Sequence, residues 1–419
     1  MSHSRSSGDK LKIITPRWCG KAPRPIFKGA LTKKKVIGAF TALVVLAWPS
    51  INAKATFLLA PSPAEKAPLV RIATLEAPKG ELFDIAIWEE KFQSAMIKEH
   101  GKNLGLAQSA NSYKHYQLAY GVDGFAAQFE ATGDTDYLDP ALFYIGEVMA
   151  SAVPSSSLPE SSYRDDFLGW GAREHPNPNI DGDEYPLFES YLWRYVARLL
   201  RVMKEAGITG EGQPYQAAYD DILAFLEVHL FDKWRQRGME HIYRSRTHMA
   251  SHWAYISLEL AHITESEARR TAAKRIVQEI NHSLRNQMVP HPDVVGGYFW
   301  DQKWNAMNLP GQDVAHGNAV IAYIVEAAEL GEGWSKDDIR ALALTFRESI
   351  WRVDGDHVEY AAFVDGSGEG TGWFSDGFIK LGRFDQEVQK RLEGHKTGRT
   401  TQFYGTAALN AKRLQLASR

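Results

Sequence analysis

The sequence predicts an all-α fold in which helical hairpins close into a ring. From about residue 81 onward, nearly every segment has the apolar spacing of a helix. A helix–turn–helix unit recurs every roughly 50 to 70 residues, with turns rich in Gly, Pro and Asp. In each unit the first helix is apolar on most sides and the second is amphipathic, as expected for an inner and an outer helix. An open helical solenoid is the alternative arrangement.

The predicted helices follow one another with short connections. A first helix spans about residues 82–100, and the turn 133–140 joins a helix at 113–132 to one at 141–152. The later units pair 185–205 with 214–229, 248–263 with 268–286, 313–330 with 337–351 and, more weakly, 373–381 with 385–395, before a last helix at 401–414.

Residues 1–55 are predicted to lie outside this fold. They are basic, contain the thirteen-residue apolar run Val36–Trp48 and end in Ala53-Lys-Ala55, the pattern of a secretory signal peptide. The run is shorter than the roughly 20 residues that span a membrane, although Thr56–Ala60 could extend it into an uncleaved anchor. We therefore expect the rest of the chain in the periplasm or secreted, or held at the inner membrane through residues 36–48.

Composition narrows the chemistry of the exported part. The only cysteine, Cys19, lies in the leader, so neither a disulfide nor a thiolate ligand is expected in the body. Beyond residue 55 the chain has 37 basic and 50 acidic residues, a formal charge of −13. This charge argues against nucleic acid as a partner. Residues 56–81, rich in Pro and Ala, are predicted to be a linker or extended arm, and residues 82–419 the catalytic domain.

Two histidine-containing helix starts are the first candidates for a site. Asp313-Val-Ala-His-Gly-Asn318 opens an almost wholly apolar helix, with Asp313 as its cap and with His316 and Asn318 in the first turn. In the second segment Thr247 is a candidate cap, and His248 and His252 share one helix face because they are four residues apart.

The hairpins, the turn Ala131–Asp139 and the opening at Asp313–Asn318 resemble the α/α-toroid carbohydrate-active enzymes, among them alginate-lyase-like and heparinase-like polysaccharide lyases. The resemblance covers about residues 82–414. It implies a toroid, either incomplete or of six hairpins, with a cleft at one mouth of the ring. The same fold also carries glycoside hydrolases and uronate epimerases, so it does not fix the reaction.

By this resemblance, the chain is expected to cleave a uronic-acid-containing polysaccharide by β-elimination. Arg246, with Arg244 as a substrate contact, would neutralise the uronate carboxylate. His248 or His252 would remove the C5 proton, and Tyr255 would protonate the leaving oxygen. The His252-Trp253-Ala-Tyr255 order only approximates the pattern of those lyases, which leaves the assignment of His252 as the base open.

A metal is the alternative use of these histidines, with His316 or Asp313 as a third ligand to His248 and His252. Because the Glu that zinc proteases place inside a His-x-x-x-His motif is missing, we expect neither a metal nor another cofactor. Both histidines could also simply hydrogen-bond neighbouring loops.

Further predicted substrate contacts are polar or aromatic residues on loops and helix starts, where stacking on a sugar and ordinary core packing are both plausible. They are Trp253, His316, Asn318, Tyr116, Tyr185, Glu184, Trp304 and Trp373. Tyr185 and Glu184 end a long loop rich in Pro, Gly and Asp, and Trp373 follows a loop with four alternating glycines, which does not have the ending of a phosphate-binding loop.

Two alternative functions compete with the lyase. A toroid glycoside hydrolase would use paired carboxylates, for which Glu184, Asp313 and Glu369 are candidates. A non-catalytic toroid that binds a polysaccharide during export would keep the aromatic residues and tolerate loss of the histidines.

Overall fold

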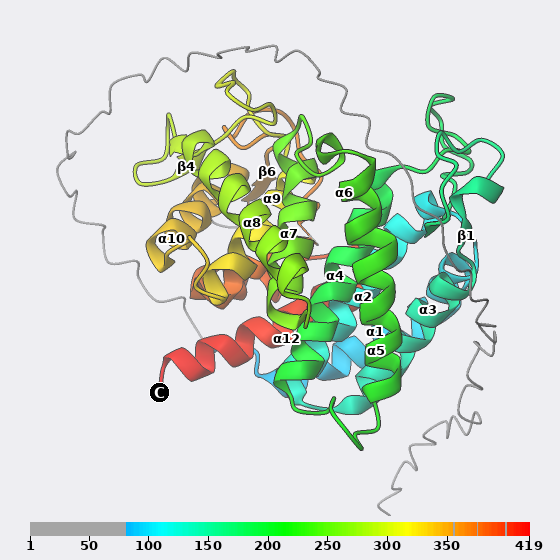
Figure 1. Ribbon diagram of the computed structural model, residues 1–419. Helices are drawn as coiled ribbons and strands as arrows, with labels where there is room; N and C mark the ends of the chain where they lie inside the picture. Colours follow the sequence, from blue (N-terminus) through cyan, green and yellow to red (C-terminus); the bar gives the residue numbers. More distant parts are fainter. Residues whose placement is uncertain (1–80, 355–356, 375, 399) are drawn as a thin grey trace, which may run out of the picture. The chain divides into compact units, whose positions relative to one another are not determined.

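Two concentric layers of helices form the described part of the protein (Figure 1). The structure is a computed structural model, and it describes residues 81–354, 357–374, 376–398 and 400–419. The predicted leader, and the predicted linker up to residue 80, lie outside the described residues. No helix in the described ranges is long and apolar enough to span a membrane.

Inner helices form a closed ring. In chain order, its members are α2 (Ser112–Thr132), α4 (Pro186–Glu205), α7 (Thr247–Ile263), α9 (Val314–Glu329), the 3₁₀ helix η6 (Phe378–Arg383) and α12 (Thr400–Ala417). Each member packs against the next, and α12 packs against α2. This closure confirms the predicted all-α toroid and excludes the open solenoid.

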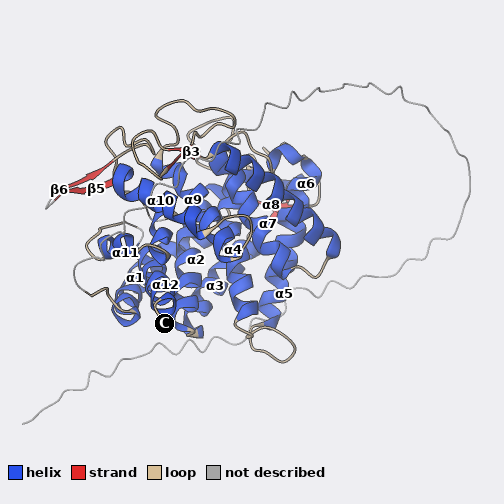
Figure 2. Cartoon of the chain, turned by 90° about the vertical axis from the view of Figure 1, so that its left-hand side faces the viewer, coloured by secondary structure: helices blue, strands red, loops and turns tan. Residues whose placement is uncertain are grey.

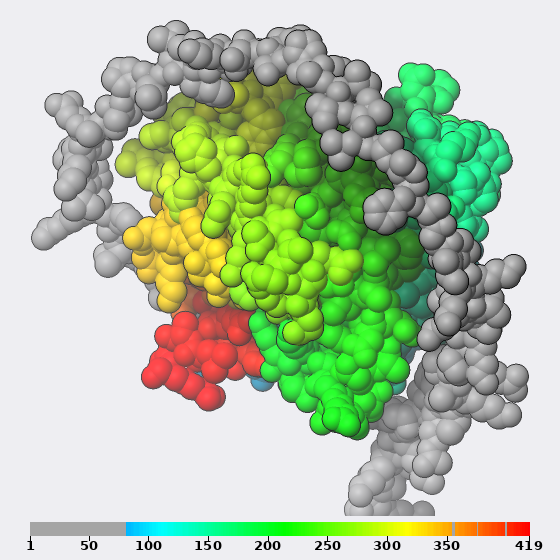
Figure 3. Space-filling model, viewed as in Figure 1, coloured from blue at the N-terminus to red at the C-terminus, as the bar shows by residue number. Residues whose placement is uncertain are grey.

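Outer helices cover the ring, with α8 on α7, α10 on α9, α5 on α4, and α1 against both α2 and α12. Their bounds are α1 (Ile85–Ala107), α3 (Leu138–Ala150), α5 (Gln216–Phe225), α6 (Lys233–Arg237), α8 (Glu267–Gln287), α10 (Lys336–Leu344) and α11 (Gln386–Leu392). In the space-filling view, the light-green outer segment around α8 and the yellow-orange segment around α10 lie next to one another on the face shown (Figure 3).

Short antiparallel strand pairs lie within the loops that connect the helices (Figure 2). They are β1 (Val153–Pro154) with β2 (Leu168–Gly169), β3 (Val289–Pro290) with β4 (Tyr298–Phe299), and β5 (Trp351–Asp354) with β6 (His357–Tyr360). The remaining short elements are the 3₁₀ turns Thr135–Tyr137, Ser155–Ser157 and Met239–His241 and the π-helical turns Leu226–Asp232 and Thr345–Ile350.

Local signals explain where the inner helices begin and end. The Asn111 side chain accepts a hydrogen bond from the amide of Tyr113 at the start of α2, and Gly133 ends the helix at a φ of 78°, which favours glycine. Pro186 is the first residue of α4, a position that needs no amide donor. Asp313 caps α9 through the amide of His316, as predicted.

Several predicted boundaries were wrong because tertiary packing overrides local signals. The first helix continues past Gly101 to Ala107, where it is held against α2 and α12. The helix predicted to end at residue 229 continues through a π turn into α6. Thr247 is not a cap but the first residue of α7, and its hydroxyl donates to the side-chain oxygen of Gln312 instead.

Candidate functional site

Four inner helices begin at one face of the ring, which we call the mouth. In the second turns of α2 and α4, the rings of Tyr116 and Tyr191 lie 3.9 Å apart between centroids. His252 of α7 lies 4.9 Å from Tyr191, again between ring centroids. The first turns of α7 and α9 meet through His248 and His316, whose ring centroids are 4.4 Å apart. Neighbouring inner helices therefore run in the same direction and present their N-terminal turns together.

An exposed imidazole paired with a carboxylate lies at the start of α9. The Nδ1 atom of His316 is 2.8 Å from Oδ1 of Asp313, and the His316 side chain is 54% exposed. Burial alone would raise the pKa of Asp313, but hydrogen bonding to the His316 side chain and the charge of that residue lower it overall. Asp313 is therefore ionised at neutral pH and can orient the His316 ring.

Two buried imidazoles lie behind His316 on α7. Burial lowers the pKa of His248 to about 3, and the neighbouring His316 adds to the shift. Burial, with the Arg194 guanidinium as a further cause, also lowers the pKa of His252. Both rings are neutral at pH 7, and the Nδ1 atom of each is buried without a hydrogen-bond partner among the described residues. The structure thus brings three of the predicted histidines together.

The two predicted arginines lie beside these histidines. Arg246 precedes the first turn of α7, and its backbone pairs with that of Lys303. Arg244 donates to the Tyr185 hydroxyl over 3.2 Å, and its guanidinium lies 5.4 Å from the centre of that ring. The positive charges of Arg246 and Arg244 both contribute to the lowered pKa of His248. An anionic group approaching His248 would therefore meet two cations.

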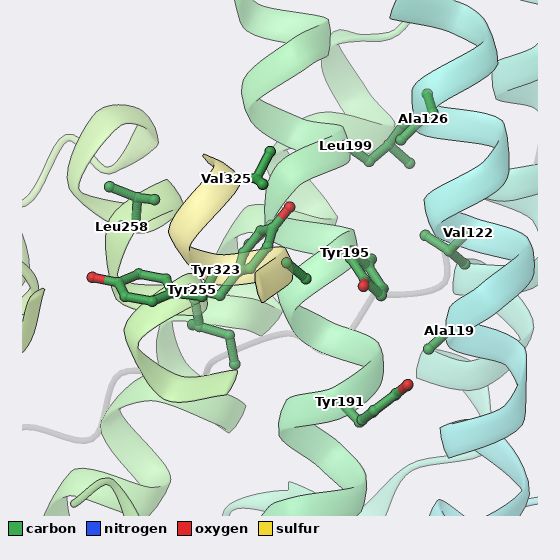
Figure 4. Packing of buried hydrophobic residues seen from close by; sticks show 14 of the residues in the cluster. Ala119, Val122, Ala126, Tyr191, Tyr195, Leu199, Tyr255, Leu258, Tyr323 and Val325 are labelled. Atoms are coloured by element: carbon green, nitrogen blue, oxygen red, sulfur yellow. The ribbon is translucent and has the colours of Figure 1, made fainter. Parts of the chain in front are cut away.

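Beneath the mouth lies a buried carboxylate that the sequence analysis did not single out. Asp376 accepts hydrogen bonds from Arg194 (2.6 Å), from the Tyr191 hydroxyl (2.7 Å) and from Tyr195. Burial alone would raise its pKa, but Arg194 and Lys380 together with the tyrosine hydrogen bonds lower it. Tyr191 and Tyr195 lie one turn apart on α4, beside α2 (Figure 4). Asp376 is therefore a buried, ionised carboxylate that accepts three side-chain hydrogen bonds, one of them from Tyr191.

Further from the mouth, the ring axis is filled by buried ion pairs. Arg198 pairs with Glu326 (3.2 Å) and with Glu130, and Arg201 pairs with Glu259 (2.5 Å) and with Glu326. Tyr255, predicted as the proton donor, belongs to this network: it is fully buried and its hydroxyl donates to Glu326 over 3.0 Å. The predicted contact Trp253 is fully buried in the core. The structure does not bring these two residues to the mouth surface.

The other predicted contacts divide between the mouth and structural positions. Tyr116 and Trp373 are half-buried at the mouth, with Trp373 edge-on to Tyr120, and the indole of Trp304 donates to the backbone oxygen of Arg244. Asn318 is fully buried.

Glu184 is 3% exposed and pairs with Lys233 at 3.0 Å and Arg237 at 3.2 Å, so its charge is neutralised within the loop cluster that anchors α6.

Two hollows of the described part of the chain lie outside the mouth. One hollow of about 500 Å³ lies between α1 and the start of α12, lined in part by Phe83, Lys91 and Tyr404, and another of about 300 Å³ lies beside Asp232 and Arg269. Neither includes a residue of the mouth described above. Among the described residues, no group of three His, Cys, Asp or Glu side chains has the geometry to hold a metal ion.

Comparison with known proteins identifies no family for this chain. No family model and no curated protein matches it. Two similar solved structures are inactive variants of an α-1,6-mannanase from Salegentibacter sp. HEL1_6, one bound to α-1,6-mannotetrose and one to α-1,6-mannotriose. They are 14% and 13% identical to this chain, cover 79% and 78% of it and 99% of their own length, and have TM-scores of 0.44 and 0.42. The resemblance to polysaccharide lyases stays a prediction.

One signal could have found the missed centre. Arg194, Arg198 and Arg201 recur at spacings of four and three residues, so they share one face of a helix that is otherwise largely apolar. Because an inner helix has no solvent-facing side, such a stripe requires buried carboxylates from its neighbours. Nothing local to Asp376 identifies it as one of them, since it comes from a segment 182 positions away from Arg194.

Proposed function

We propose that this protein is an enzyme that cleaves the glycosidic bonds of a polysaccharide at the mouth of the ring. One observation carries the proposal: the exposed His316 imidazole is paired with the ionised Asp313 carboxylate, and its ring centroid lies 4.4 Å from that of the neutral His248. An imidazole oriented by a carboxylate is suited to proton transfer with a bound substrate. The half-buried Tyr116 and Trp373 supply aromatic surface for sugar rings on the same face.

Elimination is the reaction that these groups support best. Arg244 and Arg246 would neutralise a uronate carboxylate, which acidifies the adjacent C5 hydrogen. An imidazole at the mouth would take the C5 proton, a C4–C5 double bond would form, and the C4–oxygen bond would break. The leaving oxygen would then be protonated from the mouth or from water. The substrate would accordingly be an anionic polysaccharide, as the resemblance to polysaccharide lyases also implies.

Hydrolysis is the second candidate, because Asp313 and Asp376 place two carboxylates at or under the mouth. Both have lowered pKa values, so both would serve as a base or nucleophile. A glycosidase also needs a carboxylic acid of raised pKa. Among the described carboxyl groups, the pKa is raised for Glu189 and Glu259, and both are buried in ion pairs, Glu189 with Lys233 and Glu259 with Arg201.

A substrate panel tests the proposal and separates the reactions. The purified chain is incubated with polyuronates and with neutral glycans such as a mannan, and both reducing ends and ultraviolet absorbance are followed. Elimination yields reducing ends together with the absorbance of an unsaturated sugar, whereas hydrolysis yields reducing ends alone. Binding without any new ends would overturn the enzyme proposal and favour a polysaccharide-binding protein.

A matched pair of variants assigns the activity to the mouth. His316→Gln removes the proposed acid–base group. His357→Gln makes the same change in another exposed histidine, which lies on β6 and whose Nε2 atom is 3.0 Å from a carboxylate oxygen of Glu359. We expect loss of about 100-fold or more in kcat for the first variant only. Equal activity in both variants would place the chemistry elsewhere.

A further inference from the structure

The Asn318 side chain hydrogen-bonds two stretches of backbone that follow the glycine-rich loop, one at Trp373 and one at Gly377 and Phe378. Its side-chain nitrogen donates to the backbone oxygen of Trp373 over 2.9 Å. Its side-chain oxygen accepts from the amides of Gly377 (3.0 Å) and Phe378 (3.2 Å). Because Asn318 is fully buried and both ends of its amide are used, it has no atom left for a substrate.

Gly377 lets the backbone come close enough to α9 for the Asn318 hydrogen bonds, which we call the Asn318 clamp, to form. A Cβ atom added to Gly377 would lie 1.9 Å from the backbone oxygen of Asn318, so no side chain fits between the two backbones. The φ angle of Gly377 is −123°, which any residue can adopt, so the requirement is one of space. The backbone at Gly377 is therefore pressed directly against α9.

Asp376 fixes the same region from the side of α4. Its carboxylate accepts from Arg194, Tyr191 and Tyr195, and it is 1% exposed. The Arg194 guanidinium also lies 4.3 Å from the Tyr191 ring centre. The contacts of Asn318 and Asp376 thus tie this region to α9 and α4, the two inner helices on either side of α7.

Trp373 is the residue that these contacts orient. It is half-buried, and its ring lies edge-on to Tyr120 at 5.9 Å between centroids. The hydroxyls of Tyr120 and Tyr191 lie 3.0 Å apart, and Tyr191 in turn donates to Asp376. A shift of Asp376 or of the Trp373 carbonyl would therefore move the indole relative to the tyrosines of the mouth.

We propose that Asn318 and Asp376 are positioning residues that set Trp373 as a specificity-determining contact for one sugar ring of the substrate. The inference rests on the proposed polysaccharide-cleaving function and deepens it. An indole presents a flat apolar surface that binds the C–H face of a sugar, and its contribution depends on its orientation. Loss of the clamp should then weaken substrate binding and leave the proton chemistry at His316 and His248 largely intact.

Asn318→Asp tests the clamp with little change in size. The carboxylate still accepts from Gly377 and Phe378 but can no longer donate to the Trp373 carbonyl. Asn410→Asp is the matched control: Asn410 is also fully buried, and its amide donates to the Ile379 carbonyl over 2.8 Å, whereas the Asn318 amide donates to the Trp373 carbonyl. Hydrogen exchange of the peptide containing Trp373 should be faster in Asn318→Asp than in Asn410→Asp. Equal exchange in the two variants would overturn the proposal, with or without a known substrate.

Kinetics supply the second readout, with polyglucuronate and an α-mannan as probes. We expect Asn318→Asp to raise KM about five- to tenfold with kcat nearly unchanged, and Trp373→Ala to do the same. In the Trp373→Ala background Asn318→Asp should add nothing to KM, whereas a fully additive increase would contradict a role through Trp373. Asp376→Asn should show the same pattern if it folds. If the unmodified chain neither cuts nor binds either probe, the proposed function fails while the exchange experiment still decides the positioning role.

Discussion

The Asp313 carboxylate caps α9 and holds His316 at the same time: one of its oxygens accepts from the His316 amide at 3.0 Å and lies 2.8 Å from Nδ1 of the ring. A side chain that only capped the helix would need just the first contact. The second contact fixes the ring orientation of the exposed histidine, in the way that carboxylates orient catalytic imidazoles.

Asp313→Asn separates these two roles. The amide oxygen can still cap α9, but the negative charge beside His316 is lost. We expect kcat to fall about 10- to 100-fold, while the free energy of unfolding falls by less than about 1 kcal/mol. Glu359→Gln, which removes the carboxylate beside the exposed His357, is the control and should leave kcat unchanged. A large stability loss with unchanged kcat per folded molecule would assign Asp313 to helix capping alone.

Tyr255→Phe tests the sequence-based assignment of a proton donor. The hydroxyl is fully buried and donates to Glu326. Removing it leaves a carboxylate with one donor fewer, so we expect the free energy of unfolding to fall by about 1 to 3 kcal/mol. The kcat should change by less than about twofold if the hydroxyl has only this structural role. Loss of turnover at unchanged stability, measured by denaturant unfolding alongside the assay, would instead support the catalytic assignment.

The ring itself could be predicted because its signals are local and repeated. Apolar first helices, amphipathic second helices and turn residues recur along the chain, and the Asp313 cap and the His316–His248 proximity follow from two helix starts facing one mouth. The side-chain partners inside the ring could not be predicted in the same way. Asn318 at a helix start has the same sequence signature whether it faces a substrate or, as in the structure, clamps Gly377 from another segment.

The cations that pair with buried carboxylates also could not be predicted from the sequence, for a physical reason. Because Glu184 ends a long loop, the sequence predicts it as a carboxylate at the mouth. In the structure it accepts a hydrogen bond from Lys233, 49 positions later in the chain. A buried carboxylate and a substrate-facing one are distinguished only by which cation the fold brings to them. Sequence periodicity locates helix faces, but it does not pair residues between hairpins.

Glu326→Gln tests the importance of the ion-pair network along the ring axis. Glu326 pairs with both Arg198 and Arg201, and all three residues are buried. Removing its charge leaves two buried guanidinium groups undercompensated, so the free energy of unfolding should fall by about 3 to 5 kcal/mol. Arg340→Ala, which breaks the exposed Arg340–Asp337 pair on α10, is the control and should cause no measurable change. Equal behaviour of the two variants in chemical denaturation would mean that the axial network contributes no net stability.

Acid sensitivity should arise partly from a buried histidine outside the mouth. His115 is 2% exposed and lies edge-on to Trp170 at 5.2 Å between ring centroids, and burial lowers its pKa from 6.5 to about 3. Above pH 6.5 neither the folded nor the unfolded state is protonated at this residue, so its contribution to stability is fully present. As the pH falls from 6.5 towards 3, His115 becomes protonated in the unfolded state but stays neutral in the folded state. The free energy of unfolding therefore decreases.

His115→Phe should remove this part of the acid sensitivity, because a phenyl ring can keep the packing against Trp170 and does not titrate. Between about pH 6.5 and pH 5 the native chain should lose about 2 kcal/mol more stability than the variant, as measured by denaturant unfolding at each pH. The comparison isolates His115 because His248 and His252, which are also neutral when buried, contribute equally to both proteins. Parallel pH profiles for the two proteins would mean that His115 takes up its proton in the folded state as readily as in the unfolded one, against the burial that the structure gives it.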